Sequence, residues 1–578
     1  MRKKILTIVT ILILASLALS ACGPRVKEGT VAEGEGLVTF NGYDTTDIPT
    51  LDPQLGEDTV SIDYIENLFV QLTNYDLETA DIVPEAATSW EISEDGLTYT
   101  FYLRDDIPWV KHNPETGEVK QEVDADGAPL FVEAGDFVYG IKRACNPNTG
   151  SYYSGIIAGV IKGCQDVYEF EDVENIPQDL IDAIGVSAPD AETLVIELPA
   201  PAAYFLSMSP MWTIAATPQW AIEEYGEEWI EAGNIVTNGR FVLNAWEHGV
   251  SRRILRNPLM PEDMQGYGNL DALEVNVVPE TSTGYALWLN NEVDTAGIPD
   301  AELQTHLADY PDETIQVPTL GVFYIAFRQT KAPFDNVHVR RAFSAAYDRD
   351  THVDVIEQNQ GLPMIHFAPP GIFGAPPINE VGMGFDPEYA REQLALGGYP
   401  DCEGFPQISL LGYSGEHTLN WIEFAQAQWE ENLGCSADLI QIEQQTFADL
   451  LIATKTEDDE APHMWTLAWG PDYADENNWV GDVLDCNIEV RMHRTCGEVD
   501  ELVEEARFEP DPEVRKELYR QIEDLYFGPE GEIPFFPIYL EIAYGAEHSW
   551  LDRIPALFGG AQWYNYTIDL DAKQAAQE

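Results

Sequence analysis

One carboxylate in this chain has a sequence context that suits ligand chemistry. Asp472 follows an apolar, strand-like run and a Gly-Pro turn, and it lies between Trp469 and Tyr473. A buried carboxylate flanked by aromatic rings suits a ligand ammonium, because charge pairing and cation–π attraction both strengthen once water is excluded. Asp is also common in turns for local hydrogen-bonding reasons, so this stretch alone leaves a purely structural turn as the alternative.

Motifs for catalysis are missing from the sequence. It has no G-x-S-x-G, no H-E-x-x-H, no Walker loop and no G-x-G-x-x-G. None of the ten histidines lies three or four residues from another, which excludes a pair of metal ligands on successive turns of one helix. With 101 acidic residues, a chance pair of carboxylates carries no information. We therefore expect no enzyme activity, no metal and no cofactor.

The first residues have the pattern of a secretory leader. Three basic residues precede an apolar run from Ile5 to Leu19, and Leu-Ser-Ala-Cys22 then forms a lipobox. The run is short for a membrane span, and the small residues before Cys22 suit cleavage. We expect a signal peptide over residues 1–21, a lipid anchor at Cys22 that tethers the chain to a membrane outside the cytoplasm, and a polar linker over 22–35. A cysteine placed there by chance is the alternative.

Six further cysteines remain, an even number, which predicts disulfides in an exported chain. Many pairings are possible, but the sequence-local set closes three modest loops, each worth a few kcal/mol. That set is Cys145 with Cys164, Cys402 with Cys435, and Cys486 with Cys496. Cys486, His493 and Cys496 could instead bind a metal, although a fourth ligand at a convincing spacing is missing.

The composition is strongly acidic. The 578 residues have a net charge of −71, and without residues 1–21, which contain three basic residues and no acidic one, 27 basic and 101 acidic residues leave −74. Nucleic acid is therefore an improbable partner, since phosphate binding needs a basic surface. The negative electrostatic field of such a chain favours cationic or neutral ligands. The alternative explanation of the acidity is adaptation to high salt or low pH. Hydrophobic residues at 45% are ample for several folded domains.

Local signals predict several elements. The run 98–104 alternates as a half-buried strand does. Asp386 and Asp511 each stand before a proline and an acidic residue, which predicts helix starts at both places. Residues 105–135 are rich in Pro, Gly and charge, and we expect a long exposed excursion there.

Short motifs follow one another over nearly everything after residue 36. In chain order they include 51–53, 84–90, 98–104, 126–129, 136–143, 146–151, 234–243, 333–342, 348–349, 469–473 and 533–534. In order and spacing they resemble the extracellular family 5 solute-binding proteins of ABC peptide importers. The resemblance implies an α/β, two-lobed periplasmic-binding-protein-like fold (type II, cluster C) with an extra inserted domain.

The resemblance also implies a division into domains. Domain I would contain residues 36–69, 198–296 and 535–578, domain II residues 70–197, and domain III residues 297–534. The implied function is the capture of peptides by a monomer and their delivery to an ABC permease in the membrane. An oligosaccharide or another non-peptide solute is the alternative within this fold, because some of the fourteen Trp could stack on sugars. An extracellular enzyme built on the same scaffold is an alternative of a different class.

Binding residues are implied by the same resemblance. In peptide-binding members the Asp of a Trp-x-x-Asp-Tyr motif pairs with the ligand α-amino group, and Asp472 occupies that place. Trp469 and Gly470 fall in the same loop, and Glu57, Thr59 and Tyr153 would reach the cleft from elsewhere.

The sequence also departs from the family pattern. Leu451 and Thr466 stand where relatives use Arg for ligand carboxylates, Gln444 replaces a pocket Trp, and His417 lies near a carboxylate contact. A cationic anchor for the peptide C-terminus is therefore not expected.

Overall fold

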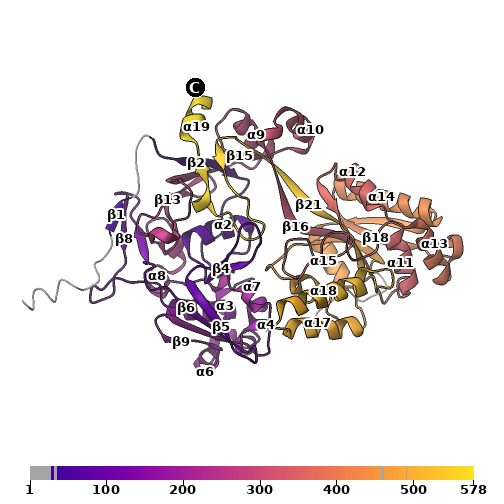
Figure 1. Ribbon diagram of the computed structural model, residues 1–578, viewed down its shortest axis with the longest axis horizontal. Coiled ribbons are helices and arrows are strands. Elements are labelled where there is room, and N and C mark those ends of the chain that lie inside the picture. Colours follow the sequence, from indigo (N-terminus) through magenta and orange to yellow (C-terminus); the bar gives the residue numbers. More distant parts are fainter. Residues whose placement is uncertain (1–27, 31–35, 457–460, 488, 490, 578) are drawn as a thin grey trace, which may run out of the picture.

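The computed structural model describes residues 28–30, 36–456, 461–487, 489 and 491–577. Within these residues the chain forms two lobes that lie side by side (Figure 1). The first lobe contains the N-terminal half of the chain and its C-terminal end, and the second contains most of the C-terminal half. Two long strands, β16 (Thr314–Phe327) and β21 (Phe535–Glu547), run between the lobes. The two-lobed α/β fold expected from the sequence is thus confirmed.

A four-stranded mixed sheet lies at the centre of the first lobe. Its order is β12-β13-β14-β2, and only β2 and β14 are parallel. The bounds are Thr39–Asp44 for β2, Phe241–Glu247 for β12, Ser251–Arg256 for β13 and Ala272–Val277 for β14. Helix α2 (Thr59–Leu68) packs near β12 and begins after Asp58, whose carboxylate accepts the Ser61 N–H at 2.9 Å. This cap fixes where α2 starts.

A second sheet lies within residues 70–197. It is antiparallel with the order β5-β6-β10-β9. The bounds are Ala87–Ile92 for β5, Thr98–Leu103 for β6, Val186–Asp190 for β9 and Thr193–Glu197 for β10. Strand β6 alternates buried and more exposed residues, as predicted for 98–104. Helix α3 (Ala134–Cys145) lies against β9 and β10.

The prediction of a long exposed excursion over 105–135 was wrong. The segment contains a hairpin, β7 and β8, within a sheet of order β1-β8-β7-β11. The bounds are Glu28–Thr30 for β1, Val110–His112 for β7, Glu118–Gln121 for β8 and Val236–Thr237 for β11. Val110 and Val119 are buried against the central sheet of the first lobe. Ile107, Trp109 and Val132 are buried as well. In the sequence these apolar residues stand among Pro, Gly and charged residues, so no strand pattern is visible. Strand β1 lies in the segment predicted as a linker.

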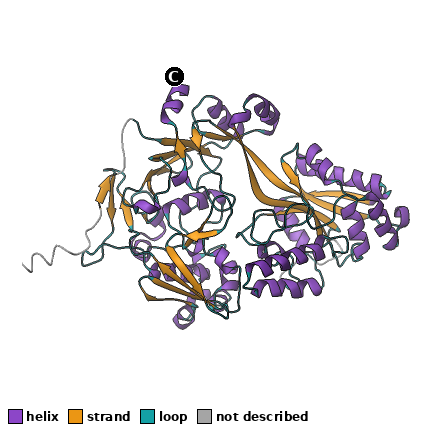
Figure 2. Ribbon diagram, viewed as in Figure 1, coloured by secondary structure: helices purple, strands orange, loops and turns teal. Residues whose placement is uncertain are grey.

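The second lobe is built on a seven-stranded sheet. Its order is β15-β21-β16-β20-β18-β19, and β17 also pairs with β21. The other bounds are Thr295–Gly297 for β15, Gly361–Pro363 for β17, Ile408–Tyr413 for β18, Ile440–Gln445 for β19 and Met464–Trp469 for β20. Helices surround this sheet (Figure 2). They are α11 (Val337–Ala345), α12 (Arg349–Val355), α13 (Pro387–Leu396), α14 (Glu416–Leu433), α15 (Phe447–Lys455), α17 (Glu498–Phe508) and α18 (Pro512–Phe527).

Two of these helices begin where the sequence predicts. The Asp386 carboxylate accepts the Tyr389 N–H at 3.0 Å at the start of α13. The Asp511 carboxylate accepts the Val514 N–H at 3.3 Å at the start of α18. In both helices proline occupies the first turn, where its missing N–H costs no hydrogen bond.

The chain crosses between the lobes inside β16 and β21. The two strands pair from Thr314 opposite Ala546 to Ala326 opposite Phe535, with a register shift after Pro318. Residues 535–540, assigned to domain I from the sequence, pack in the cores of the second lobe. Because one strand continues through both lobes, its sequence contains no signal that marks the boundary between them.

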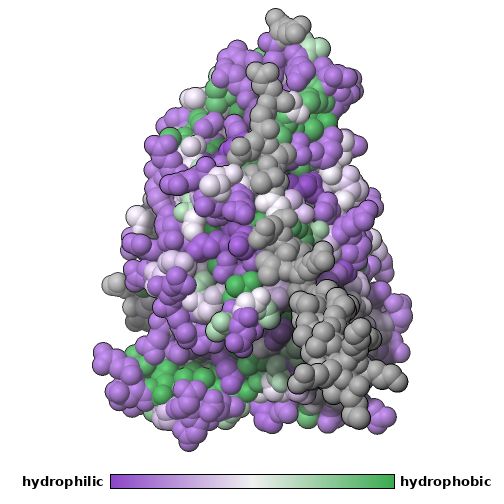
Figure 3. Space-filling view, turned by 90° about the vertical axis from the view of Figure 1, so that its left-hand side faces the viewer, coloured by the Kyte–Doolittle hydropathy of each residue, from purple (hydrophilic) through white to green (hydrophobic). Residues whose placement is uncertain are grey.

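Shorter elements complete both lobes. They include β3 (Thr73–Tyr75), β4 (Ile82–Pro84), α4 (Ser154–Val160), α5 (Cys164–Tyr168), α6 (Gln178–Asp182), α7 (Phe205–Met208), α8 (Gln219–Tyr225), α9 (Thr281–Leu289), α10 (Asp300–Asp309), α16 (Asn477–Val480), β22 (Leu551–Asp552), β23 (Thr567–Ile568) and α19 (Leu570–Gln577). Among the described residues, no helix has the length and apolar character needed to cross a membrane. The outer face of the first lobe is mainly hydrophilic, with apolar side chains showing near its lower end and in patches near its top (Figure 3).

Candidate ligand-binding site

A cavity of about 420 Å³ lies between the two lobes. The first lobe contributes one face of α2 and the loops around Tyr153 and Trp212, and the second contributes the loop 470–472. Strand β16 and the C-terminal loop 556–560 complete the lining. Because both lobes line the cavity, its shape depends on how they are arranged.

The loop that carries Asp472 is held by one amide side chain. The Asn478 Oδ1 accepts the Asp472 N–H at 2.9 Å and the Trp469 Nε1–H at 3.2 Å. The Asn478 Nδ2 lies 3.4 Å from the Asp472 carboxylate. Asn478 lies in the first turn of α16, so this short helix sets the position of the Asp472 carboxylate.

Asp472 is half-buried and has no cationic partner in the part of the chain that the structure describes. Burial raises its pKa to about 6, and the nearby charge of Asp482 adds to this effect. The Asn478 amide acts in the opposite direction. A carboxylate with this environment gains most from a ligand that brings a positive charge, because the ion pair would replace part of the lost hydration.

Helix α2 presents one face to the same cavity. Thr59, Ile62, Asp63 and Glu66 all line it, and their spacing of three, four and seven residues places them on one side of a helix. Glu57 lies just before the helix and lines the cavity as well. The i+4 and i+7 spacing from Thr59 is the signal that could have identified Asp63 and Glu66, which the sequence analysis missed.

The two acids on α2 are tied to the C-terminal loop. The Asp63 Oδ1 accepts the Ala561 N–H and the Glu66 Oε2 accepts the Gly560 N–H, both at 2.8 Å. Burial is the main cause that raises the pKa of Asp63 to about 6 and that of Glu66 to about 8. In the absence of a ligand, both carboxyl groups therefore hold their protons more tightly than exposed carboxyl groups do.

Aromatic rings form the remaining walls. Tyr153 packs edge-on against Trp212 with ring centroids 5.0 Å apart, and Tyr75 packs edge-on against Phe558 at 4.8 Å. Burial and then the charge of Asp472 raise the pKa of Tyr153 well above its usual range, so these two groups are close. Tyr75, Trp212 and Phe558 are far apart in sequence and no local pattern links them.

A second cavity of about 500 Å³ lies beside the first and shares Asp472 with it. Trp469 lines this second cavity and not the first. Tyr473, expected to flank Asp472, stacks on Tyr204 of the first lobe at 5.6 Å and donates its hydroxyl to Asp482 at 2.7 Å. It is therefore a contact between the lobes in this structure.

Five of the six residues predicted for the site line the first cavity: Glu57, Thr59, Tyr153, Gly470 and Asp472. The positions that depart from the family pattern line neither cavity. Of these, Thr466 is fully buried on β20, and Gln444 donates to the Gly415 carbonyl at 3.0 Å. His417 lies 3.4 Å from Glu357, and this contact raises its pKa.

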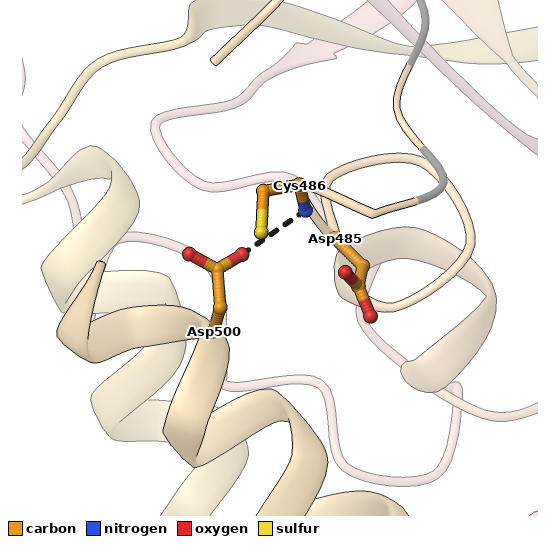
Figure 4. A group of neighbouring side chains, drawn as sticks. All are labelled: Asp485, Cys486 and Asp500. Carbon is orange, nitrogen blue, oxygen red and sulfur yellow. Dashed lines mark hydrogen bonds between the residues drawn. The ribbon is translucent and has the colours of Figure 1, made fainter. Parts of the chain in front are cut away.

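The six cysteines are joined in the sequence-local pairs, Cys145–Cys164, Cys402–Cys435 and Cys486–Cys496. Cys486 lies near two carboxylates, Asp485 and Asp500 (Figure 4). Its sulfur is bonded to Cys496, and a thiolate is what binds metal. Asp500 is already paired with Arg494, so this group is not a convincing metal site.

Comparisons with known proteins agree with this geometry. The family model described as bacterial extracellular solute-binding proteins, family 5 middle, matches residues 81–488. The periplasmic oligopeptide-binding protein OppA of Escherichia coli is 28% identical and the alignment covers 86% of this chain and 85% of that protein. The oligopeptide-binding protein OppA of Bacillus subtilis is 28% identical, with 93% and 94% covered. Heme-binding protein A of Haemophilus influenzae is 27% identical, with 82% and 81% covered.

Solved structures show the same fold. The murein tripeptide-binding protein MppA in its unliganded open form has a TM-score of 0.77 at 23% identity, covering 93% of this chain and 98% of that one. Haemophilus influenzae OppA in complex with the peptide RPPGFSPFR has a TM-score of 0.65 at 21% identity, with 93% and 100% covered. The two-lobed arrangement is therefore that of solute-binding proteins.

Proposed function

The chain belongs to the bacterial extracellular solute-binding proteins of family 5, and we propose that it captures peptides outside the cytoplasm and delivers them to an ABC importer. The observation that carries this proposal is the cavity between the lobes, where Asp472 stands without a cationic partner among the described residues. A peptide α-ammonium supplies the missing charge. The names of the OppA relatives support the same ligand class.

The proposed mechanism is closure about the strands between the lobes. A ligand that contacts the α2 face of the first lobe and the 470–472 loop of the second stabilises the closed arrangement over the open one. Main-chain hydrogen bonds would hold an extended peptide and leave its side chains loosely specified. No covalent step is proposed, because the relatives are binding proteins and the described lining of the cavity offers no nucleophile with an adjacent base.

Domain organisation and anchoring belong to the same proposal. We propose domain I (36–69, 198–296, 535–578), domain II (70–197) and domain III (297–534) as the folding units, except that residues 535–540 pack with domain III before β21 crosses to domain I. Cys22 and the signal peptide lie outside the described residues. Replacement of Cys22 by Ser is expected to release the protein from the membrane fraction, and retention of the variant there would refute the lipid anchor.

The direct test is identification of the ligand that accompanies the protein through purification. Denaturation followed by mass spectrometry is expected to release a mixture of short peptides with free amino termini. Release of an oligosaccharide or a heme instead would contradict peptide capture.

A non-peptide solute is the second candidate. It is favoured by the aromatic walls of the cavity and by the name of the heme-binding relative. A neutral sugar or an anionic heme would leave the carboxylates of the cavity without a counter-charge, so we place it behind the peptide.

A further inference from the structure

The charged side chains that line the first cavity are all acidic. Glu57, Asp63, Glu66 and Asp472 face it, and no Lys or Arg does so among the described residues. The overall acidity of the chain makes acids common on its surface, where water solvates them. Inside a cavity each extra carboxylate costs free energy unless a positive group accompanies it. A single α-ammonium at Asp472 would leave three acids unmatched.

Two of these acids form a second acidic position, on α2. Asp63 and Glu66 lie on the same face of α2, and Glu66 lies seven residues beyond Thr59, about 10 Å along the helix axis. One oxygen of each is fixed by a backbone N–H from the C-terminal loop. The other oxygen of each has no hydrogen bond or ion pair in the described part of the chain, so it is available to a ligand.

The one basic side chain among the charges that shift the pKa values of these acids is already engaged. Arg553 acts on Asp63, but its guanidinium donates to Glu547 at 2.6 Å and to the Tyr566 hydroxyl at 3.0 Å. Glu85 acts on Glu66 and is paired with Arg240. Neither arginine lines the cavity. Among the described residues, the second acidic position therefore has no protein counter-ion of its own.

Aromatic rings stand beside this position. Tyr75 and Phe558 line the cavity with Glu66, and the charge of Glu66 helps to raise the pKa of Tyr75. A cation held by a carboxylate against ring faces gains from both contacts. The combination suits the ammonium of a lysine or the guanidinium of an arginine, whose carbon stems would pack on the rings.

We infer that the cavity selects dicationic amine ligands, specifically peptides that place their α-ammonium at Asp472 and a lysine or arginine side chain from the first or second residue at Asp63 and Glu66. This inference rests on the proposed function and names its ligand class. Free polyamines share the chemistry of two linked cations, and the test distinguishes them from peptides.

Protonation of Glu66 provides a second readout. The titratable groups facing it are Asp63 on the same helix, Glu85, and the phenols of Tyr75 and Tyr564. Because burial raises the pKa of Glu66 to about 8, this carboxyl is mainly protonated at pH 7 in the free protein. A ligand cation lowers that pKa, so binding at pH 7 should release a proton.

The test is calorimetry at pH 7 and physiological salt with Lys-Lys-Ala, its uncharged match norleucyl-norleucyl-alanine, and spermidine. The parent is expected to bind Lys-Lys-Ala at least about tenfold more tightly than the norleucine peptide. In Asp63→Asn and Glu66→Gln this ratio should approach one, mainly because Lys-Lys-Ala binds more weakly. Most of the proton release should disappear in Glu66→Gln. The control Glu78→Gln removes an exposed charge outside the cavity and should keep the ratio.

Three results would overturn the inference. Equal affinities of the two peptides for the parent would refute the dicationic preference and leave peptide binding standing. Failure of both peptides to bind would refute the proposed function as well. Binding of spermidine without either peptide would assign the cavity to free polyamines.

Discussion

At the scale of single residues, the site is defined by a carboxylate that the fold does not neutralise. Asp472 is positioned by Asn478, and burial raises its pKa to about 6. The fold thus maintains an uncompensated acid, which costs free energy in the free protein. A ligand ammonium recovers part of that cost, and recovery of this kind is what produces affinity.

The pH dependence of peptide affinity follows from this carboxyl group. Below about pH 6 the free protein has Asp472 protonated, and a neutral acid cannot pair with an ammonium. Affinity for Ala-Ala-Ala should therefore fall as the pH decreases through 6, approaching tenfold for each further unit. Calorimetry between pH 5 and 7 measures it, with Asp472→Asn as the control that should lose the dependence. The same affinity at pH 5 and pH 7 in the parent would show that another group binds the amine.

At the scale of elements, the binding loop depends on a buried ion pair behind it. The Asp475 Oδ2 accepts Arg515 Nη2 at 2.5 Å, and the Tyr519 hydroxyl donates to the same carboxylate at 3.0 Å. Arg515 also lies over the Phe373 ring at 4.1 Å. Helix α18 thereby fixes the loop three residues after Asp472.

Loss of that pair should be costly. Arg515→Met leaves the Asp475 charge buried without its partner, and the free energy of unfolding should fall by about 3–5 kcal/mol. The neighbouring exposed pair gives the matched control, since Lys516→Met breaks an ion pair with Glu513 that is worth about 1 kcal/mol or less. Chemical denaturation of both variants measures the difference. Equal losses in the two would mean that the buried pair does not hold the loop.

At the scale of the whole molecule, two lobes meet at a cavity and are joined by β16 and β21. Contacts already exist across the boundary, such as the stacking of Tyr204 on Tyr473 and the Ala203 N–H donated to the Arg507 carbonyl at 3.0 Å. We expect a ligand that contacts both lobes to close them further.

Peptide binding should compact the protein. Small-angle scattering is expected to give a smaller radius of gyration with a saturating peptide mixture than without it, because closure brings the lobes together. Asp472→Asn at the same peptide concentration should stay at the larger value. Identical radii for the parent with and without peptide would refute the hinge mechanism.

Much of the fold was predictable from local signals. The helix caps at Asp386 and Asp511 and the alternation over 98–104 are present in the structure as predicted. The short strands within 105–135 were not, because the apolar residues that they bury stand among Pro, Gly and charged residues and form no regular pattern. In the site, the loop around Asp472 was identified from sequence. The α2 acids and the aromatic walls were not, because the cavity is assembled from segments that only the tertiary fold brings together.

Calorimetry of free-amine peptides binding to the parent and to Asp472→Asn tests directly whether this carboxylate holds the ligand amine. This substitution keeps the shape of the side chain and removes its charge, and loss of one partner from a desolvated charge pair costs about 2–5 kcal/mol. Binding should be at least about 30-fold weaker, and the melting temperature in the absence of ligand should be no lower than that of the parent. N-acetylated peptides should bind the parent poorly and lose little more in the variant. A variant that holds free-amine peptides as tightly as the parent does would contradict the account.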